Sequence, residues 1–135
     1  MPRLSYWFIR LALVHLVLGY TLGGLMLVQK GGAMHPAVWV FRLAHQEILL
    51  AGFMLQLVFG VAFWILPRAA SPQSERPMMA ALVLINAGVW LVAAAGAMPE
   101  WSGITILGRL SEAGAVCLFT TSIWPRVRTF QQGRR

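Results

Sequence analysis

Cysteine and charged residues are both scarce in this chain of 135 residues. The only cysteine is Cys117, which excludes an intrachain disulfide framework and a cysteine-rich zinc site. Charged side chains make up 11% of the sequence, and only four of them are acidic. That share is too small to cover a soluble domain of this size with charged side chains. The scarcity of charge therefore excludes an ordinary soluble protein.

Hydrophobic residues take the place of the missing charges, at 59% of the sequence and a mean hydropathy of +0.70. Four apolar runs, at about 4–28, 37–66, 78–98 and 104–124, are each long enough for a transmembrane helix, which needs about 20 residues. The short breaks between them contain glycine or proline, and short connections make neighbouring helices antiparallel. We therefore predict an all-α integral membrane protein, a single four-helix transmembrane bundle over residues 1–135.

The N-terminal run is interpreted as the first membrane helix. It is too long for the apolar part of a cleaved signal peptide, and no small-x-small cleavage site follows it. The sequence is therefore predicted to be a four-span, multi-pass protein of a bacterial-type inner cell membrane.

The positive charge of the chain is distributed unevenly about the predicted spans. Arginines gather at the N-terminus, in the second connection and at the C-terminus, which an even number of spans places on one side: Arg3, Arg10, Arg68, Arg76, Arg126, Arg128, Arg134 and Arg135. The other two connections contain only Lys30 and Glu100 as charged residues. By the positive-inside rule, both termini are predicted to be cytoplasmic. The net charge of +7 then reflects topology, and nucleic acid is not an expected partner.

All three histidines, His15, His35 and His45, fall in the first half of the chain. An imidazole inside an apolar run is costly to bury and marks a candidate functional site. A neutral imidazole offers a lone pair to iron, zinc or copper. The alternative for His45 is a buried ring hydrogen-bonded to a neighbouring helix, and the alternative for His35 is plain exposure in a loop. The three histidines are therefore candidate metal ligands, with His45 the strongest.

Two residues near His45 in the sequence are candidates for the same site. Arg42 lies three residues before His45, on the same helical face, and would neutralise the propionates of a heme bound there. Its alternative role is to snorkel to the membrane interface. Gly52 lies seven residues after His45, also on that face, and leaves space for a porphyrin edge or another helix. In the last span, Arg109 and Glu112 lie three residues apart on one helical face and could simply pair with each other, in place of a functional role.

The second apolar run resembles one helix of a known superfamily. A histidine, spaced small residues and a Leu-Pro-Arg exit follow in the order His45, Gly52-Phe53, Gly60-Val61-Ala62 and Trp64-Ile65-Leu66-Pro67-Arg68. This pattern resembles the second helix of the catalytic subunit of heme-copper oxygen reductases and nitric oxide reductases. The resemblance implies that His45 is an axial ligand of a low-spin heme. The family's subunit has about twelve helices and further histidines on later ones, which this chain lacks. Reduction of oxygen or nitric oxide is therefore not expected.

The depths of the histidines indicate how a heme would be held. At about 1.5 Å per residue, His45 and His15 are expected to differ in depth by about 10 Å within one chain. A twofold homodimer, in contrast, places His45 of both copies at the same height, with the heme at the interface. An intrachain heme between tilted helices is the alternative arrangement.

The sequence thus predicts a membrane b-type cytochrome that binds heme b through two histidines, His45 with His15 or His35, and transfers electrons within the membrane. A variant is a heme-dependent oxidoreductase acting on quinone or a small oxidant, with a respiratory redox partner. The rival prediction is a non-heme membrane protein. It would either handle copper or zinc, with Met34 and His35 as an outer-loop ligand pair, or be a structural accessory subunit of a respiratory complex.

Overall fold

The first span folds as one long helix, α1 (Arg3–Lys30). The computed structural model describes residues 2–32, 35–66, 75–98, 100 and 102–132. Helix α1 ends at a Gly31-Gly32 turn, in which Gly32 has a φ of 82°. Glycine adopts this left-handed conformation without steric cost, so it is the favoured residue just after a helix. The helix thus ends two residues beyond position 28, where the first span was predicted to end.

The second span changes its helical type three times. It begins as a 3₁₀ helix, η1 (Pro36–Phe41), continues as α2 (Arg42–Glu47), widens into a π-helix, η2 (Ile48–Leu55), and ends as α3 (Gln56–Ile65). Together these helices cover residues 36–65, against the predicted 37–66. The sequence did not indicate the π-helix, because Ile48–Leu55 is apolar throughout. A π-segment within a longer helix is rare and is often found at functional sites.

The second pair of spans consists of α4 (Arg76–Ala95) and α5 (Ser102–Gln132). Helix α5 extends eight residues beyond the predicted end at 124 and passes through Pro125. Hydropathy predicts where the apolar core of a span ends, whereas a helix continues for as long as its backbone remains hydrogen-bonded. A proline inside a helix removes one of these hydrogen bonds and weakens the helix without necessarily ending it.

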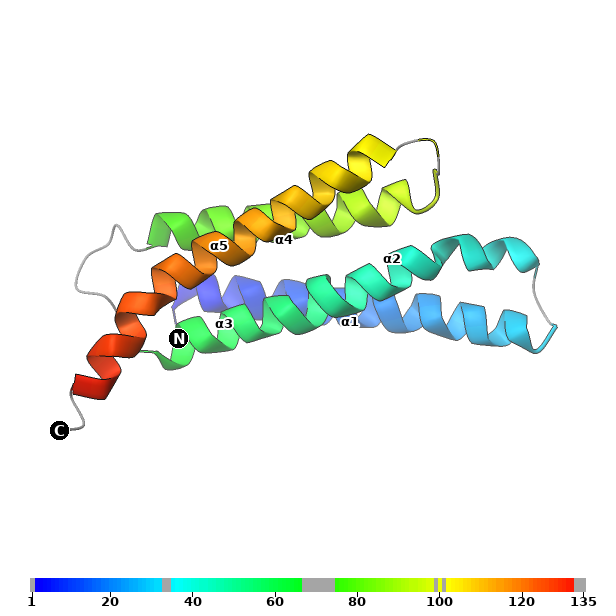
Figure 1. Ribbon diagram of the computed structural model, residues 1–135. Coiled ribbons are helices and arrows are strands. Elements are labelled where there is room, and N and C mark those ends of the chain that lie inside the picture. Colours follow the sequence, from blue (N-terminus) through cyan, green and yellow to red (C-terminus); the bar gives the residue numbers. More distant parts are fainter. Residues whose placement is uncertain (1, 33–34, 67–74, 99, 101, 133–135) are drawn as a thin grey trace.

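The four spans form two antiparallel hairpins, as Figure 1 shows. Helix α1 packs along α2, η2 and α3, whereas α4 packs along α5. The hairpins meet where α2 and η2 lie against α4. The start of α1 and the end of α5 lie at the same end of the bundle (Figure 1). The predicted all-helical bundle is therefore confirmed, and no strand occurs in the part of the chain that the structure describes.

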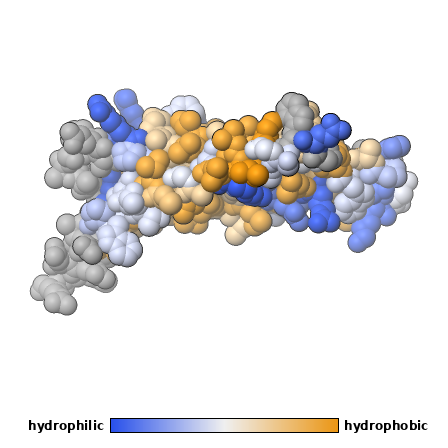
Figure 2. Space-filling model, turned by 45° about the horizontal axis from the view of Figure 1, so that its top comes forward, coloured by the Kyte–Doolittle hydropathy of each residue, from blue (hydrophilic) through white to orange (hydrophobic). Residues whose placement is uncertain are grey.

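Length and hydropathy make all four spans compatible with a membrane. The helices Arg3–Lys30 and Arg76–Ala95, the composite span Pro36–Ile65 and the segment Ser102–Val127 are each long and apolar enough to cross one. Figure 2 shows an apolar band around the middle of the visible face, with hydrophilic residues toward both ends. Large hydrophobic side chains such as Leu27 and Ile65 are exposed on the spans. Such a surface is suited to hydrocarbon rather than to water.

Candidate functional site

His45 is held against the backbone of the first span. Its Nδ1 atom lies 2.8 Å from the carbonyl oxygen of Gly19 on α1. A carbonyl oxygen only accepts hydrogen bonds, so this contact places the ring proton on Nδ1 and leaves the lone pair on Nε2. The ring lies over Gly23, where an added Cβ would be 2.7 Å from Cε1 of His45. Glycine at position 23 therefore makes room for the imidazole.

The ring of His45 lines a shallow recess of about 370 Å³ between α1 and the start of the second span. Two cations, Lys30 and Arg42, line the same recess. The indole of Trp39, at its edge, hydrogen-bonds the side-chain amide oxygen of Gln29. The complete lining consists of Gly23, Met26, Leu27, Lys30, Trp39, Arg42, His45 and Gln46. None of these residues is acidic, so the recess combines one imidazole with an uncompensated positive charge.

His15 occupies a different position, deep between the spans, and is only 2% exposed. Its ring fits over Gly52 of η2, where an added Cβ would be 2.8 Å from Cγ of His15. The Nδ1 atom has no hydrogen-bond partner among the described residues. On its other side the ring lies against Trp90 of α4, with the ring centroids 5.8 Å apart. The space that Gly52 leaves is therefore filled by His15.

The structure does not bring the three histidines together. His45 lies opposite Gly23 of α1, eight residues beyond His15, which corresponds to about 12 Å along the helix. Metal–imidazole bonds are about 2 Å long, so one ion cannot bind both rings in this arrangement. His35 is exposed before η1, and its Nδ1 accepts a hydrogen bond from the backbone N–H of Ala37 at 3.2 Å. Among the described residues, no group of three or more His, Cys, Asp or Glu side chains is placed to hold a metal ion.

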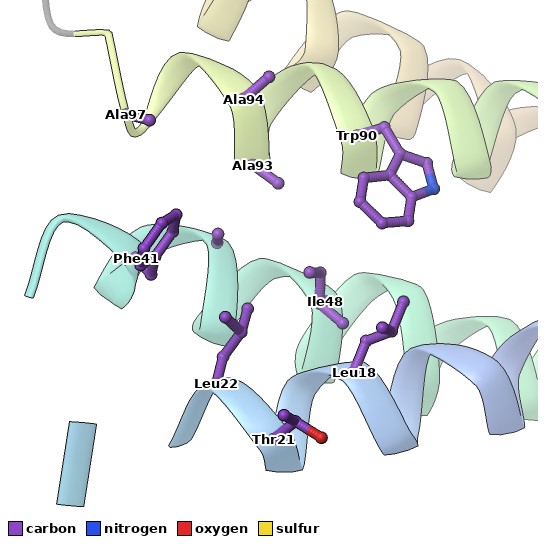
Figure 3. Close-up of a pocket in the computed structure, with 10 residues that line it drawn as sticks. Leu18, Thr21, Leu22, Phe41, Ile48, Trp90, Ala93, Ala94 and Ala97 are labelled. Atoms are coloured by element: carbon purple, nitrogen blue, oxygen red, sulfur yellow. The ribbon is translucent and has the colours of Figure 1, made fainter. Parts of the chain in front are cut away.

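An apolar groove of about 400 Å³ lies between the hairpins (Figure 3). Leu18 and Leu22 of α1 form one wall, and Trp90 of α4 projects toward them from the other (Figure 3). Its one hydroxyl, on Thr21, is bonded within α1 to the carbonyl oxygen of Val17. This hydroxyl is therefore not free to orient a ligand in the groove. His15 contacts the ring of Trp90 but is not part of the groove lining.

A cluster of ionisable residues joins the two hairpins. The predicted pair of Arg109 and Glu112 is confirmed, with 2.8 Å between Nη1 and Oε2. Glu47 of α2 also binds this guanidinium, with 2.6 Å between its Oε2 and Nη2. The sequence analysis did not identify Glu47 as a site residue. Its position could have indicated this contact. Glu47 lies two residues after His45, which places it on a different helical face, away from α1.

No known protein family, curated protein or solved structure matches the chain. The interpretation of the site therefore depends on its own geometry and on the resemblance of the second span.

Proposed function

We propose that this chain is a membrane b-type cytochrome that holds heme b through His45 and transfers electrons within the membrane. The observation that supports this most directly is the hydrogen bond from His45 Nδ1 to the carbonyl oxygen of Gly19. Metal-binding histidines almost always donate their second ring N–H in this way, which fixes the tautomer and raises the basicity of the ligating nitrogen. The helix thus holds His45 with Nε2 as the nitrogen that would bind iron.

The residues around His45 fit the other parts of a heme. Arg42 and Lys30 would bind the two propionates, because guanidinium and ammonium groups form charge-assisted hydrogen bonds with carboxylates. The apolar lining from Met26 and Leu27 suits a porphyrin edge. Gly23 also lines the recess and has no side chain to fill it. The recess thus provides one axial ligand, two cations and free space.

A second axial ligand would come from a second copy of the chain. Within one copy, neither His15 nor His35 lies with His45. A twofold axis beside this recess would bring the His45 rings of the two copies to the same height, with one ring on each face of a shared heme. Iron with two axial histidines has no open coordination position and supplies one-electron transfer. The homodimer would then bind one heme for two chains through bis-histidine ligation.

The membrane placement of this cytochrome follows from the same features. We place the four spans in the inner membrane of a bacterial-type cell, with both termini cytoplasmic, because Arg3 of α1, Arg76 of α4 and Arg126 of α5 lie toward the end of the bundle at which α1 starts and α5 ends (Figure 1). The recess would then face the opposite leaflet, because α1 ends beside it. A quinone or a respiratory redox protein would exchange electrons with the heme edge there.

The proposal is tested by purifying the protein in mild detergent and recording oxidised and dithionite-reduced spectra, with heme quantified against protein. We expect the sharp reduced bands of a low-spin b-type heme at a ratio of half a heme per chain. The variant His45→Ala is expected to lose the heme and retain its helical content. His35→Ala is the matched control and is expected to keep it. A folded, colourless wild-type protein expressed with ample heme, or unchanged heme in His45→Ala, would refute the proposal.

A structural accessory subunit of a respiratory complex is the second candidate, and one observation favours it. Polar side chains of the second span bond directly to backbone carbonyls of α1, since Gln56 also donates to Phe8 at 3.3 Å. Hydrogen bonds between helices lock a bundle without any cofactor. Copper or zinc handling would rely on His35 and Met34, of which Met34 lies outside the described residues. Metal analysis of colourless protein distinguishes these two alternatives.

A further inference from the structure

We propose that Glu112, held beside Glu47 by Arg109, is a proton-binding site inside the membrane-spanning part of the bundle. This inference shares with the proposed function only the membrane placement and does not require a heme. Both carboxylates bond through Oε2 to the two terminal nitrogens of one guanidinium, so they are brought next to each other. The cluster joins the second span to the fourth.

The charges of this cluster do not balance when all three groups are ionised. Two carboxylates and one guanidinium leave a net charge of one negative unit. The cavity beside the cluster is lined by Leu43, Gln46, Glu47, Leu50, Ala51, Leu55, Arg109 and Glu112. Arg109 is the only cation in this lining, and Gln46 is neutral. On α4, Gly88 lies against Glu112, and glycine has no side chain that could carry a charge. No group lining the cavity therefore compensates the second carboxylate.

Burial makes this imbalance costly. Glu47 is 5% exposed and Glu112 is 8% exposed, whereas half of the Arg109 side chain is exposed. An uncompensated charge in an apolar environment shifts its protonation equilibrium until it is neutralised. Two carboxylates that share a site cannot both ionise easily, so one of them holds a proton. The cluster becomes neutral when it takes up one proton.

The geometry favours Glu112 as the group that holds the proton. Its Oε1 atom is buried and has no hydrogen-bond partner among the described residues. An ionised carboxylate with an unpartnered buried oxygen is strongly disfavoured, whereas a neutral carboxyl loses much less. Gly88 makes room for this side chain, because an added Cβ there would lie 2.6 Å from Cγ of Glu112. The fold therefore accommodates Glu112 in an apolar position without pairing its second oxygen.

A metal cation would not satisfy the same site. Calcium and magnesium take about six or more oxygen ligands, counting water. Here Oε2 of each carboxylate is engaged with Arg109, which leaves only the two Oε1 atoms. The guanidinium would also repel a second cation. A proton needs only one oxygen, and a cavity of about 310 Å³ adjoins the cluster. The ligand that fits this chemistry is a single exchangeable proton.

Infrared spectroscopy of the intact protein tests this directly. The chain has only four side-chain carboxyls, Glu47, Glu75, Glu100 and Glu112. Glutamate labelled with ¹³C at its side-chain carboxyl separates these four from heme propionates and lipids. At neutral pH we expect the C=O stretching band of one protonated glutamate per chain, with a shift in heavy water that shows exchange. Glu75 and Glu100 are exposed and lie outside the cluster.

Three variants assign the band. Glu112→Gln is expected to remove it. Glu47→Gln is expected to remove it too, because Glu112 alone is then compensated by Arg109. The control Glu100→Gln is expected to retain it. Absence of the band in wild-type protein at neutral pH overturns the proposal even if a variant fails to fold. A band that persists in folded Glu112→Gln or Glu47→Gln also overturns the proposal. Heme content does not enter any of these outcomes, so the two proposals fail independently.

Discussion

The two hairpins of this bundle use different means to hold their helices together. In the first, side chains of the second span reach the backbone of α1, as His45 does at Gly19 and Gln56 does at Phe8. In the second, α4 and α5 approach through glycine, and Asn86 bonds only within its own helix, to the carbonyl oxygen of Leu82. The histidines belong only to the first hairpin.

The four spans also differ in how much of their surface is buried inside the bundle. Half of the most apolar window of α4 is buried inside the bundle, whereas only 22% of the corresponding window is buried in α1 and 17% in the segment Ser102–Val127 of α5. Helix α4 is therefore the packed centre, and α1 presents most of its surface to the outside. A ligand or a second copy of the chain has access to α1 and to the histidine beside it. The ion cluster connects the hairpins through a salt bridge, and the guanidinium of Arg126 on α5 also lies over the ring of Phe63 on α3, 4.3 Å from its centroid.

Breaking the ion cluster should have the largest effect on stability. Arg109→Met leaves the buried Glu47 and Glu112 side chains without their cation and is expected to lower the free energy of unfolding by about 3 kcal/mol. This is the lower end of the range for broken buried ion pairs, because half of the Arg109 side chain is exposed. Far-UV circular dichroism during denaturation in mixed detergent micelles measures the change.

The matched control replaces the whole cluster by apolar residues. A triple variant, Arg109→Met with Glu47→Leu and Glu112→Leu, should recover most of the lost stability, because an apolar replacement of a complete buried ion cluster is often neutral. If the triple variant were as unstable as Arg109→Met, loss of packing rather than unpaired charge would be the cause.

The next largest effect is expected within the second hairpin. A Cβ at Gly88 would lie 2.8 Å from the carbonyl oxygen of Gly108, which is backbone and cannot turn aside. Gly88→Ala is therefore expected to cost about 1–3 kcal/mol, the range for overpacked cores. Gly103→Ala, on the same hairpin, meets no heavy atom within 4 Å and should leave the unfolding midpoint unchanged or slightly raised. Equal midpoints for the two variants would contradict the close approach.

Much of the fold could be predicted from the sequence, because hydropathy and helix breaks report on the chain locally. The four spans and the pairing of Arg109 with Glu112 follow from run length and from spacing on one helix. The π-helix Ile48–Leu55 and the contact of Glu47 with Arg109 depend on how separate spans pack, which no local pattern encodes. The sequence also placed His45 and Gly52 on one face, and both face α1. It gave no sign that His15 would fill the space at Gly52.

Substitutions at two neighbouring glycines of α1 test whether the His45 ring needs the space beside it. A Cβ at Gly23 would lie 2.7 Å from the His45 ring, whereas a Cβ at Gly24 would meet nothing within 4 Å. Gly23→Ala is expected to displace the imidazole and weaken heme binding by about tenfold or more, as loss of supporting contacts does at metal sites. Gly24→Ala should bind heme like the wild type. Heme titration of the two purified variants measures the difference, and equal affinities would show that the ring does not need this space.

The smallest effect is expected at the second hydrogen bond between α1 and the second span. Gln56→Leu removes the bond to the carbonyl oxygen of Phe8, and such bonds between membrane helices are worth about 0.6 kcal/mol on average. The same change removes the Oε1 atom of Gln56, which is buried without a partner among the described residues, so the loss is partly offset. We expect a change in unfolding free energy below about 0.6 kcal/mol and an unchanged heme content. A loss of unfolding free energy as large as that of Arg109→Met would contradict this expectation. It would mean that polar contacts stabilise the first hairpin as strongly as the ion cluster stabilises the contact between the two hairpins.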